Sequence, residues 1–464
     1  MRAIKRMAVE SSLVAGEEGE VEVNDDRISL LPDPILTMIL SLIPVIEAAR
    51  TSVLSKRWRY LWTSIPHLDF FNFFDAFFPG GLPTQVGEKC ISVFNQIFAC
   101  RQAHINSCEL PIFDDCPFDL DYFFFRLDEL GIQDLLLSYF GKDPINLPSL
   151  FFCNSLKKLK ILCFLVRLPS QFNQLTNLQA LELIVVSITS THLETLVAGC
   201  PRLENLTICQ SVHLSELRIR APNLLLLDIF VEEDKRRFRF SLIKAPRLKH
   251  IVLGYSLNKE FRHNFSEEED EEDENKIDEV DNLIKLLMNL DHLERFSFRC
   301  CPYLFKFKSI MRLPDSLPIG CQLVHMKKLF MELNFDDAAM VSPLLFLLRS
   351  CPNLEQLSLE CRCSKTGFPI ETNYWEKQKP PECLKSHLMT IQIEYIRLSS
   401  KNVIEFLKFL LVNARVLVRM RLLYSKSSTD QSKEDIVVNE LLLFNRASQN
   451  ALLEIKPGRR FYGS

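Results

Sequence analysis

The chain has 464 residues, 47% of them hydrophobic, which is ample material for a buried core. Its net charge of −4 comes from 55 basic and 59 acidic residues, and eight of the acids form one run, Glu267 to Glu274. The rest of the chain is therefore nearly neutral, which argues against a nucleic-acid-binding surface. Only 13 glycines are present, which disfavours phosphate-binding loops, and no window of about 18 apolar residues predicts a transmembrane helix.

Residues 1–24 are polar and acidic and predict a disordered tail; Arg2, Lys5 and Arg6 precede no apolar segment, so we expect no signal peptide. Residues 31–62 then predict three short helices. Asp33 is the expected N-cap of the first, with Pro34 at the first helical position, and Pro44 ends it. The second covers 46–51, and Ser55 caps a third that carries Trp58, Leu61 and Trp62. An element of about 30 residues buries little of its apolar surface by itself, and we therefore expect another polypeptide to cover it. The alternative is that these three helices are an ordinary part of a larger core within this chain.

The segments LPD, ILS, RTSVLSKRW and LW, in this order and spacing, resemble the F-box of the large plant F-box family. The resemblance covers about a tenth of the chain. It implies docking on a Skp-type adaptor, and through it on a cullin–RING ubiquitin ligase, by apolar and aromatic anchors. By the same resemblance, the expected adaptor contacts are Leu31, Pro32, Leu36, Leu40, Leu54, Trp58 and Leu61.

A short pattern, L-x-x-L-x-L/I, recurs thirteen times along the remaining chain. Its last two apolar positions alternate with period 2, as in a strand with one buried face, and most steps are close to the leucine-rich-repeat period of about 20–29 residues. The first positions of the thirteen frames are Ile105, Ile132, Leu156, Leu178, Leu203, Leu214, Leu224, Leu248, Leu293, Met326, Leu354, Leu388 and Leu417.

Helical spacing of apolar residues predicts helices between several frames, at 191–198, 282–289, 338–349 and 402–412. The frames at Leu203, Leu214 and Leu224 are only 11 and 10 residues apart, so short coils are expected between those strands. We therefore predict an α/β protein: an N-terminal three-helix F-box followed by an irregular leucine-rich-repeat solenoid. A generic α/β protein with leucine-rich strands is the alternative.

The segments CPRLENL at 200–206 and CPNLEQL at 351–357 resemble the irregular leucine-rich repeats of plant F-box proteins. Trp375, PECL at 381–384, NARVL at 413–417 and LLLFNRAS at 441–448 resemble an FBD domain, although Asn445 stands where that family often has proline. We infer that the FBD region continues the solenoid and caps its open edge. The expected domains are a tail at 1–24, the F-box at 25–71, repeats at 72–373 with a disordered acidic insertion at about 266–281, the FBD at 374–455, and a tail at 456–464.

Motifs for chemistry are absent from the sequence: there is no nucleotide-binding loop, no HExxH, no zinc-type CxxC pair and no GxSxG. The fifteen cysteines are scattered, many within apolar runs (Cys153, Cys163 and Cys209), and are expected to be reduced, buried side chains. We therefore predict no catalytic, cofactor or metal residues and a non-catalytic protein. Residues 427–435 are polar and are expected to loop out between FBD strands.

Together these features predict a substrate-recognition subunit of a Skp–cullin–F-box ubiquitin ligase, with an unknown target protein and no nucleic-acid or membrane partner. Target contacts are expected at variable strand positions, taken as Arg202, Glu204, Asn205 and Thr207. Two other functions stay open: a repeat scaffold without ligase assembly, and a small-molecule receptor on the repeat face. Nucleus and cytoplasm are both expected locations.

Overall fold

A computed structural model describes most of the chain, and it divides into two compact units, residues 1–65 and 66–464. The residues described are 28, 30–70, 98, 101, 103–114, 119–172, 174–211, 213–214, 216–232, 239–256, 279–299, 313–361, 369–371, 373–425 and 431–458. The predicted tail at 1–24 and the acidic run Glu267–Glu274 lie outside these residues.

The first unit contains the three predicted helices, α1 (Asp33–Leu40), α2 (Val45–Arg50) and α3 (Trp58–Leu61), with short 3-10 turns at η2 (Thr51–Val53) and η3 (Trp62–Ser64). Our N-cap assignment was wrong by one residue, because Pro32, in an extended conformation, precedes the helix and Asp33 is its first residue. The Asp33 carboxylate instead accepts a hydrogen bond from Nε of Arg57 at 2.7 Å. The N-cap of α3 is Arg57 and not the predicted Ser55, although Oγ of Ser55 accepts a hydrogen bond from the Trp58 amide at 3.3 Å.

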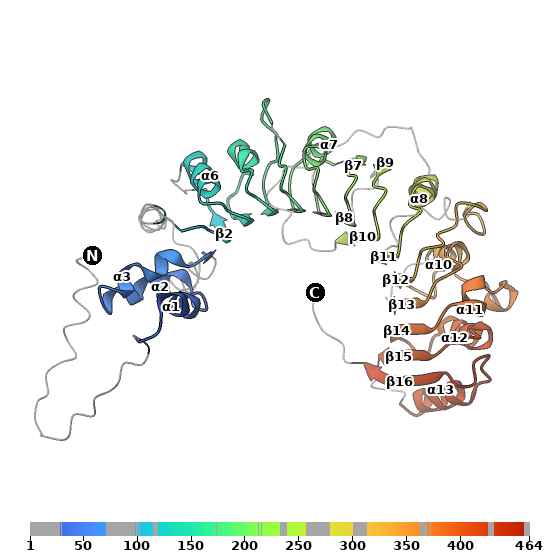
Figure 1. Cartoon of the computed structure of the whole chain (residues 1–464). Helices are drawn as coiled ribbons and strands as arrows, with labels where there is room; N and C mark the ends of the chain where they lie inside the picture. Colours follow the sequence, from blue (N-terminus) through green and yellow to red (C-terminus); the bar gives the residue numbers. More distant parts are fainter. Residues whose placement is uncertain are drawn as a thin grey trace, which may run out of the picture. The chain divides into compact units, whose positions relative to one another are not determined.

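The second unit is a curved array of parallel strands with helices on its outer side (Figure 1). Its main sheet has fourteen strands, ordered β1-β2-β3-β4-β5-β6-β8-β10-β11-β12-β13-β14-β15-β16. Their bounds are β1 (His67–Asp69), β2 (Ser107–Ile112), β3 (Asp134–Tyr139), β4 (Lys158–Leu162), β5 (Ala180–Ile184), β6 (Asn205–Cys209), β8 (Leu226–Glu232), β10 (His250–Ser256), β11 (Arg295–Arg299), β12 (Lys328–Leu333), β13 (Gln356–Cys361), β14 (Thr390–Ile396), β15 (Arg419–Ser425) and β16 (Leu452–Gly458).

All thirteen predicted frames form strands, and twelve of these belong to the main sheet. The frame at Leu214 differs: its strand β7 (Glu216–Arg220) pairs with β9 (Arg239–Lys244) in a separate two-stranded sheet. The reason is the short spacing, because the frames at Leu203 and Leu214, only 11 residues apart, fit into one repeat. The second strand then takes the outer position that a helix occupies elsewhere, and β7 and β9 lie between α7 (Ser190–Ala198) and α8 (Glu279–Met288) in Figure 1.

The outer layer contains the four predicted helices, α7, α8, α10 (Ala338–Ser350) and α12 (Lys401–Asn413), and three further ones, α6 (Leu120–Glu129), α11 (Glu382–Ser386) and α13 (Gln431–Leu443). Three boundary predictions were wrong. Helix α13 starts at Gln431 inside the expected 427–435 loop, α8 starts at Glu279 inside the expected acidic insertion, and β16 extends to Gly458 inside the expected C-terminal tail. Residues 67–69, which were expected to belong to the F-box, form strand β1 and pair with β2 in the sheet.

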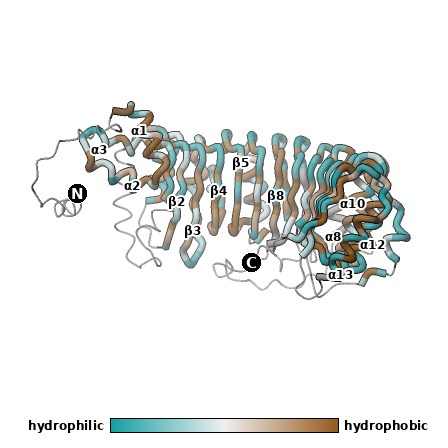
Figure 2. Tube along the Cα trace, turned by 90° about the horizontal axis from the view of Figure 1, so that it is seen from below, coloured by the Kyte–Doolittle hydropathy of each residue, from teal (hydrophilic) through white to brown (hydrophobic). Residues whose placement is uncertain are grey.

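The core of the second unit is a double row of apolar side chains that point from the strands toward the helices. On β5 these are Leu181 and Leu183, both fully buried, and equivalent pairs recur in register along the sheet. Figure 2 shows hydrophobic stretches recurring on successive strands, with hydrophilic residues at the turns. Nine cysteines lie among the described residues and form no disulfide; Cys153 and Cys163 are buried as predicted, whereas Cys209 is half-buried. Burial raises the pKa of Cys153 and of Cys200 to about 12, so both thiols are protonated at neutral pH.

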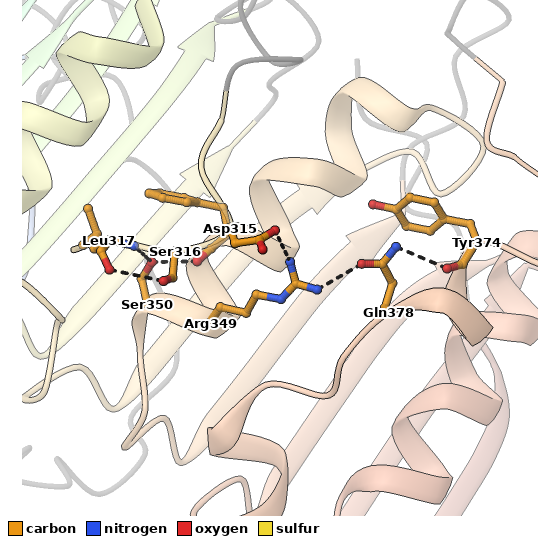
Figure 3. A network of polar contacts seen from close by, with 8 residues as sticks. Asp315, Ser316, Leu317, Arg349, Ser350, Tyr374 and Gln378 are labelled. Atoms are coloured by element: carbon orange, nitrogen blue, oxygen red, sulfur yellow. Dashed lines mark hydrogen bonds and ion pairs between the residues drawn. The ribbon is translucent and has the colours of Figure 1, made fainter. Parts of the chain in front are cut away.

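The FBD segment is packed directly into this array. Trp375, at η6 (Trp375–Lys377), is 2% exposed, and its ring lies 4.6 Å from that of Phe406 on α12. Arg349 at the end of α10 pairs with Asp315 at 3.1 Å and donates to Oε1 of Gln378 at 3.0 Å (Figure 3). These contacts join the last repeats to the FBD segment as one body, which ends on β16 with Pro457, a residue that cannot donate to a further strand.

Candidate docking surfaces

Helix α1 carries apolar residues on two faces. Leu36 and Leu40 are 0% and 2% exposed and face the interior of the first unit. A second stripe continues through α1 and the turn after it at helical spacing, and its members are Ile35 (39% exposed), Met38 (58%), Ile39 (40%), Leu42 (82%) and Ile43 (40%). We call these five residues the α1 stripe. Three helices cannot bury both faces, so the stripe is left facing solvent.

The interior of the first unit is a small cluster of Leu36, Leu40, Ala48, Trp58, Leu61 and Ile65, with Leu31 and Trp62 packed against its edge. Arg57 connects the segment before α3 to the beginning of α1, because its guanidinium donates hydrogen bonds to the carboxylate of Asp33 and to the carbonyl of Leu31. The Trp62 indole donates to the carbonyl of Arg59 at 3.0 Å. The unit is therefore held together without using the α1 stripe.

The seven predicted adaptor contacts fall into two groups. Leu36, Leu40, Trp58 and Leu61 are buried in the cluster of the first unit, so they support the module and could reach a partner only if the cluster opened. Leu31 is half-buried, while Pro32 and Leu54 are exposed and stay predicted contacts. The sequence interpretation missed the α1 stripe because it treated the helix as having one apolar face. The signal for the second apolar face was the spacing of Met38, Ile39, Leu42 and Ile43, which lie three, four, seven and eight residues after Ile35.

The second unit offers a broad inner face, formed by strand side chains that point away from the helices. Register aligns them into rows. The middle row runs Glu109, Leu136, Lys160, Glu182, Thr207, Asp228, Val252, Ser297, Phe330, Ser358, Gln392 and Arg421. A further row lies two residues after the middle row on each strand. On β4, β5, β6 and β8 it contains Leu162, Ile184, Cys209 and Phe230, and on β12, β13 and β14 it contains Glu332, Glu360 and Glu394.

Two of the four predicted target contacts lie on this face: Asn205 is exposed on β6, and Thr207 is half-buried in the middle row. Arg202 and Glu204 instead lie in the turn before β6. There Arg202 donates to Oδ1 of Asn177 at 3.2 Å, and Arg247 makes the same contact with Asn223 at 3.0 Å. Arg202 therefore links neighbouring turns at the edge of the sheet. Whether these residues contact a target stays a prediction.

Charges on the inner face are mostly compensated. Lys158 pairs with Asp134 at 3.1 Å and Lys160 with Glu182 at 3.0 Å. Asp228 is different, because its Oδ1 is buried and has no hydrogen-bond partner among the described residues. Burial raises the pKa of Asp228 to about 6; Arg299 opposes this rise and Glu182 adds to it. On β10, burial and the neighbouring Arg295 lower the pKa of His250.

Within the described ranges there is no group of three or more His, Cys, Asp or Glu residues that could hold a metal ion. Among the same residues, no helix is long and apolar enough to cross a membrane.

Comparison with known proteins identifies three domains. Residues 28–69 match the F-box domain, 120–266 match the leucine-rich repeats of "FBD-associated F-box protein At5g56370", and 376–422 match the FBD. The chain is 28% identical to the F-box/FBD/LRR-repeat protein At1g13570 of Arabidopsis thaliana, over 92% of this chain and 98% of that protein. It is also 28% identical to the F-box/FBD/LRR-repeat protein At3g26920 of the same plant, over 94% and 97%. A third relative, Arabidopsis F-box/LRR-repeat protein 13, is 31% identical over 50% of this chain and 54% of its own length.

Proposed function

We propose that this chain, which has the domain composition of the F-box/FBD/LRR-repeat proteins, is the substrate-recognition subunit of a Skp–cullin–F-box ubiquitin ligase. Proteins with an F-box and leucine-rich repeats generally serve as non-catalytic substrate adaptors of such ligases. The first unit would bind a Skp-type adaptor, and through it a cullin, while the inner face of the repeats holds a target protein. The chain would act by proximity, since holding the target near a ubiquitin carrier raises its effective concentration.

The α1 stripe is the observation that supports this proposal most. Five large apolar side chains on one helix and its following turn are 39–82% exposed in a unit whose own cluster is already closed. Val53 (70% exposed) and Leu54 (66%) add apolar surface at the end of η2. Such a surface fits a protein groove lined by apolar residues, in which a few buried anchors supply most of the binding free energy.

The test is titration calorimetry of the purified full-length chain with a purified plant Skp-type adaptor. The variant Met38→Asp/Leu42→Asp places two charges on the α1 stripe without touching the cluster, and we expect it to bind about 100-fold more weakly, as the loss of central apolar anchors does. Ser64→Asp is the control, because it adds a negative charge at an exposed polar position of the first unit outside the α1 stripe. Equal affinity of the double variant and wild type, or no binding by wild type, would refute adaptor docking through this stripe.

A further inference from the structure

An apolar ladder crosses part of the inner face, next to polar and charged residues of the middle row such as Glu182, Thr207 and Asp228. Leu162, Ile184, Cys209 and Phe230 lie in direct register on β4, β5, β6 and β8, and all four are half-buried. Strands β4, β5 and β8 are labelled in this order along the array in Figure 2, and β6 pairs with both β5 and β8. With about 4.8 Å between neighbouring strands, the ladder spans roughly 14 Å, the length of four or five extended residues.

A glycine on the neighbouring strand leaves room for the Phe230 ring at the end of the ladder. Gly254 on β10 is the register neighbour of Phe230, and a Cβ atom there would lie 2.8 Å from Cδ1 of the Phe230 ring. Any larger residue at 254 would therefore displace the ring. The same added Cβ would lie 3.3 Å from Cβ of Arg299 on β11, so the ring occupies a defined place on the face.

Asp228 lies beside the ladder, two residues before Phe230 on the same side of β8. Its register neighbours are Thr207 on β6 and Val252 on β10, neither of which carries a charge. The carboxylate of Glu182, two strands away, is paired with Lys160, whereas Oδ1 of Asp228 is buried with no hydrogen-bond partner among the described residues. Buried acceptors without a partner are uncommon and destabilise a protein, so this one calls for an explanation.

We propose that Asp228 and the apolar ladder form the recognition site for a short target segment with an arginine or lysine side chain next to apolar residues. The basic group would pair with the carboxylate of Asp228, which is half-buried on the inner face, and the apolar side chains would cover the ladder. This inference rests on the proposed target-binding role of the repeats and specifies the chemistry of that target. An acidic segment is disfavoured, because it would meet Asp228 without a counterion.

Charge complementarity favours a basic group over a neutral one. A carboxylate that accepts from a guanidinium or ammonium forms a charge-assisted hydrogen bond, about twice as strong as a neutral one. Arg299 on β11 is the basic residue that acts on Asp228, and it is exposed. Its guanidinium carbon lies 5.2 Å from the ring centre of Phe330, so the side chain is directed toward β12. Oδ1 of Asp228 therefore has no hydrogen-bond partner among the described residues, whereas Lys158 and Lys160 on the same face are ion-paired.

The experiment is selection of randomised twelve-residue peptides, displayed on phage, against the full-length chain in complex with its Skp-type adaptor. We expect wild type to enrich peptides with Arg or Lys next to apolar residues, and Asp228→Lys to enrich peptides with Asp or Glu instead. Glu109→Lys is the matched control, because Glu109 occupies the same row on β2, away from the ladder. It should keep the wild-type preference.

A selected peptide then gives quantitative tests by fluorescence anisotropy. We expect Asp228→Asn, which keeps the shape of the side chain, to bind that peptide at least 30-fold more weakly, and Phe230→Ala to bind it about 10-fold more weakly. The absence of any basic preference in wild type, or undiminished binding by Asp228→Asn, would overturn the inference. Adaptor binding in the same preparations is measured separately, so a failure here is distinguishable from a failure of the ligase proposal.

Discussion

The two units of this protein bury apolar side chains in opposite ways. In the repeat unit most strands of the main sheet add two apolar residues to a core shared with their neighbours, so Leu181 and Leu183 are fully buried although β5 has only five residues. In the F-box unit the core is closed after a handful of residues, and Leu42 is left 82% exposed. A repeat array can extend its core with each repeat, whereas a three-helix module cannot. The exposed apolar surface of the module is therefore the feature on which the proposed adaptor docking depends.

The largest effect that this comparison predicts is in the repeat unit. Trp375→Ala removes a ring packed against Phe406 and Phe409 and should lower the free energy of unfolding by about 3–5 kcal/mol. Urea unfolding followed by circular dichroism measures this loss. Tyr122→Ala is the control, since that aromatic ring is 59% exposed on α6 and its removal should change stability little. Equal losses in the two variants would contradict the packing described for the FBD segment.

The next effect concerns the interior of the module. Trp58→Ala should destabilise the F-box unit by about 3 kcal/mol, because the indole is 6% exposed within the cluster that closes this unit. Hydrogen–deuterium exchange should show faster exchange across residues 33–62 and unchanged exchange in strands β4–β6. For the same reason, adaptor binding lost in Trp58→Asp or Leu40→Asp would report unfolding of the module. Slow exchange in Trp58→Ala would mean that the cluster does not hold the helices together.

A smaller effect is expected at the edge of the docking surface. Val53→Asp and Leu54→Asp alter side chains that are 70% and 66% exposed, so the module should stay folded while adaptor affinity falls by about 1–2 kcal/mol each. Calorimetric titration with the adaptor measures this change. If both variants bind like wild type, the docking surface is limited to the α1 stripe.

The smallest effect is a pH dependence at Asp228. Its pKa of about 6 lies above the ordinary aspartate value of 3.8, so ionisation of this group destabilises the folded state above pH 6, and the destabilisation declines as the pH falls from 6 toward 3.8. The charged groups that act on the carboxylate are Arg299, which favours its ionised form, and Glu182, which opposes it.

Asp228→Asn removes this ionisation. The variant should therefore be more stable than wild type at pH 8, by roughly 1 kcal/mol after discounting for partial solvent exposure, and by about half as much at pH 5. Urea unfolding at both pH values measures the two differences. Equal stability of variant and wild type at pH 8 would show that the carboxylate is solvated.

Much of the fold could be predicted because one local rule governs it. Each frame places two apolar residues at period 2, and all thirteen frames became strands. Strand β16 was missed because polar Asn450 stands at the first position of its frame, ahead of Leu453 and Ile455. Which sheet a strand joins depends on neighbours in space, so the frame at Leu214 gave a strand but could not show its pairing with β9.

The candidate sites were less predictable for a related reason. Sequence identifies Leu36 and Ile35 as apolar residues of one helix, but only packing shows that the first is buried and the second exposed. The same holds for Asp228, whose free carboxylate oxygen results from the absence of a basic register neighbour on β6 and β10, a property of strand order.

The most direct test of the central claim is hydrogen–deuterium exchange of the full-length chain with and without a Skp-type adaptor. The account predicts strong protection of residues 35–43 on adaptor binding, weaker protection at 53–54, and no change across β4–β6. Protection confined to the repeats, or no protection of residues 35–43 at saturating adaptor, would contradict it.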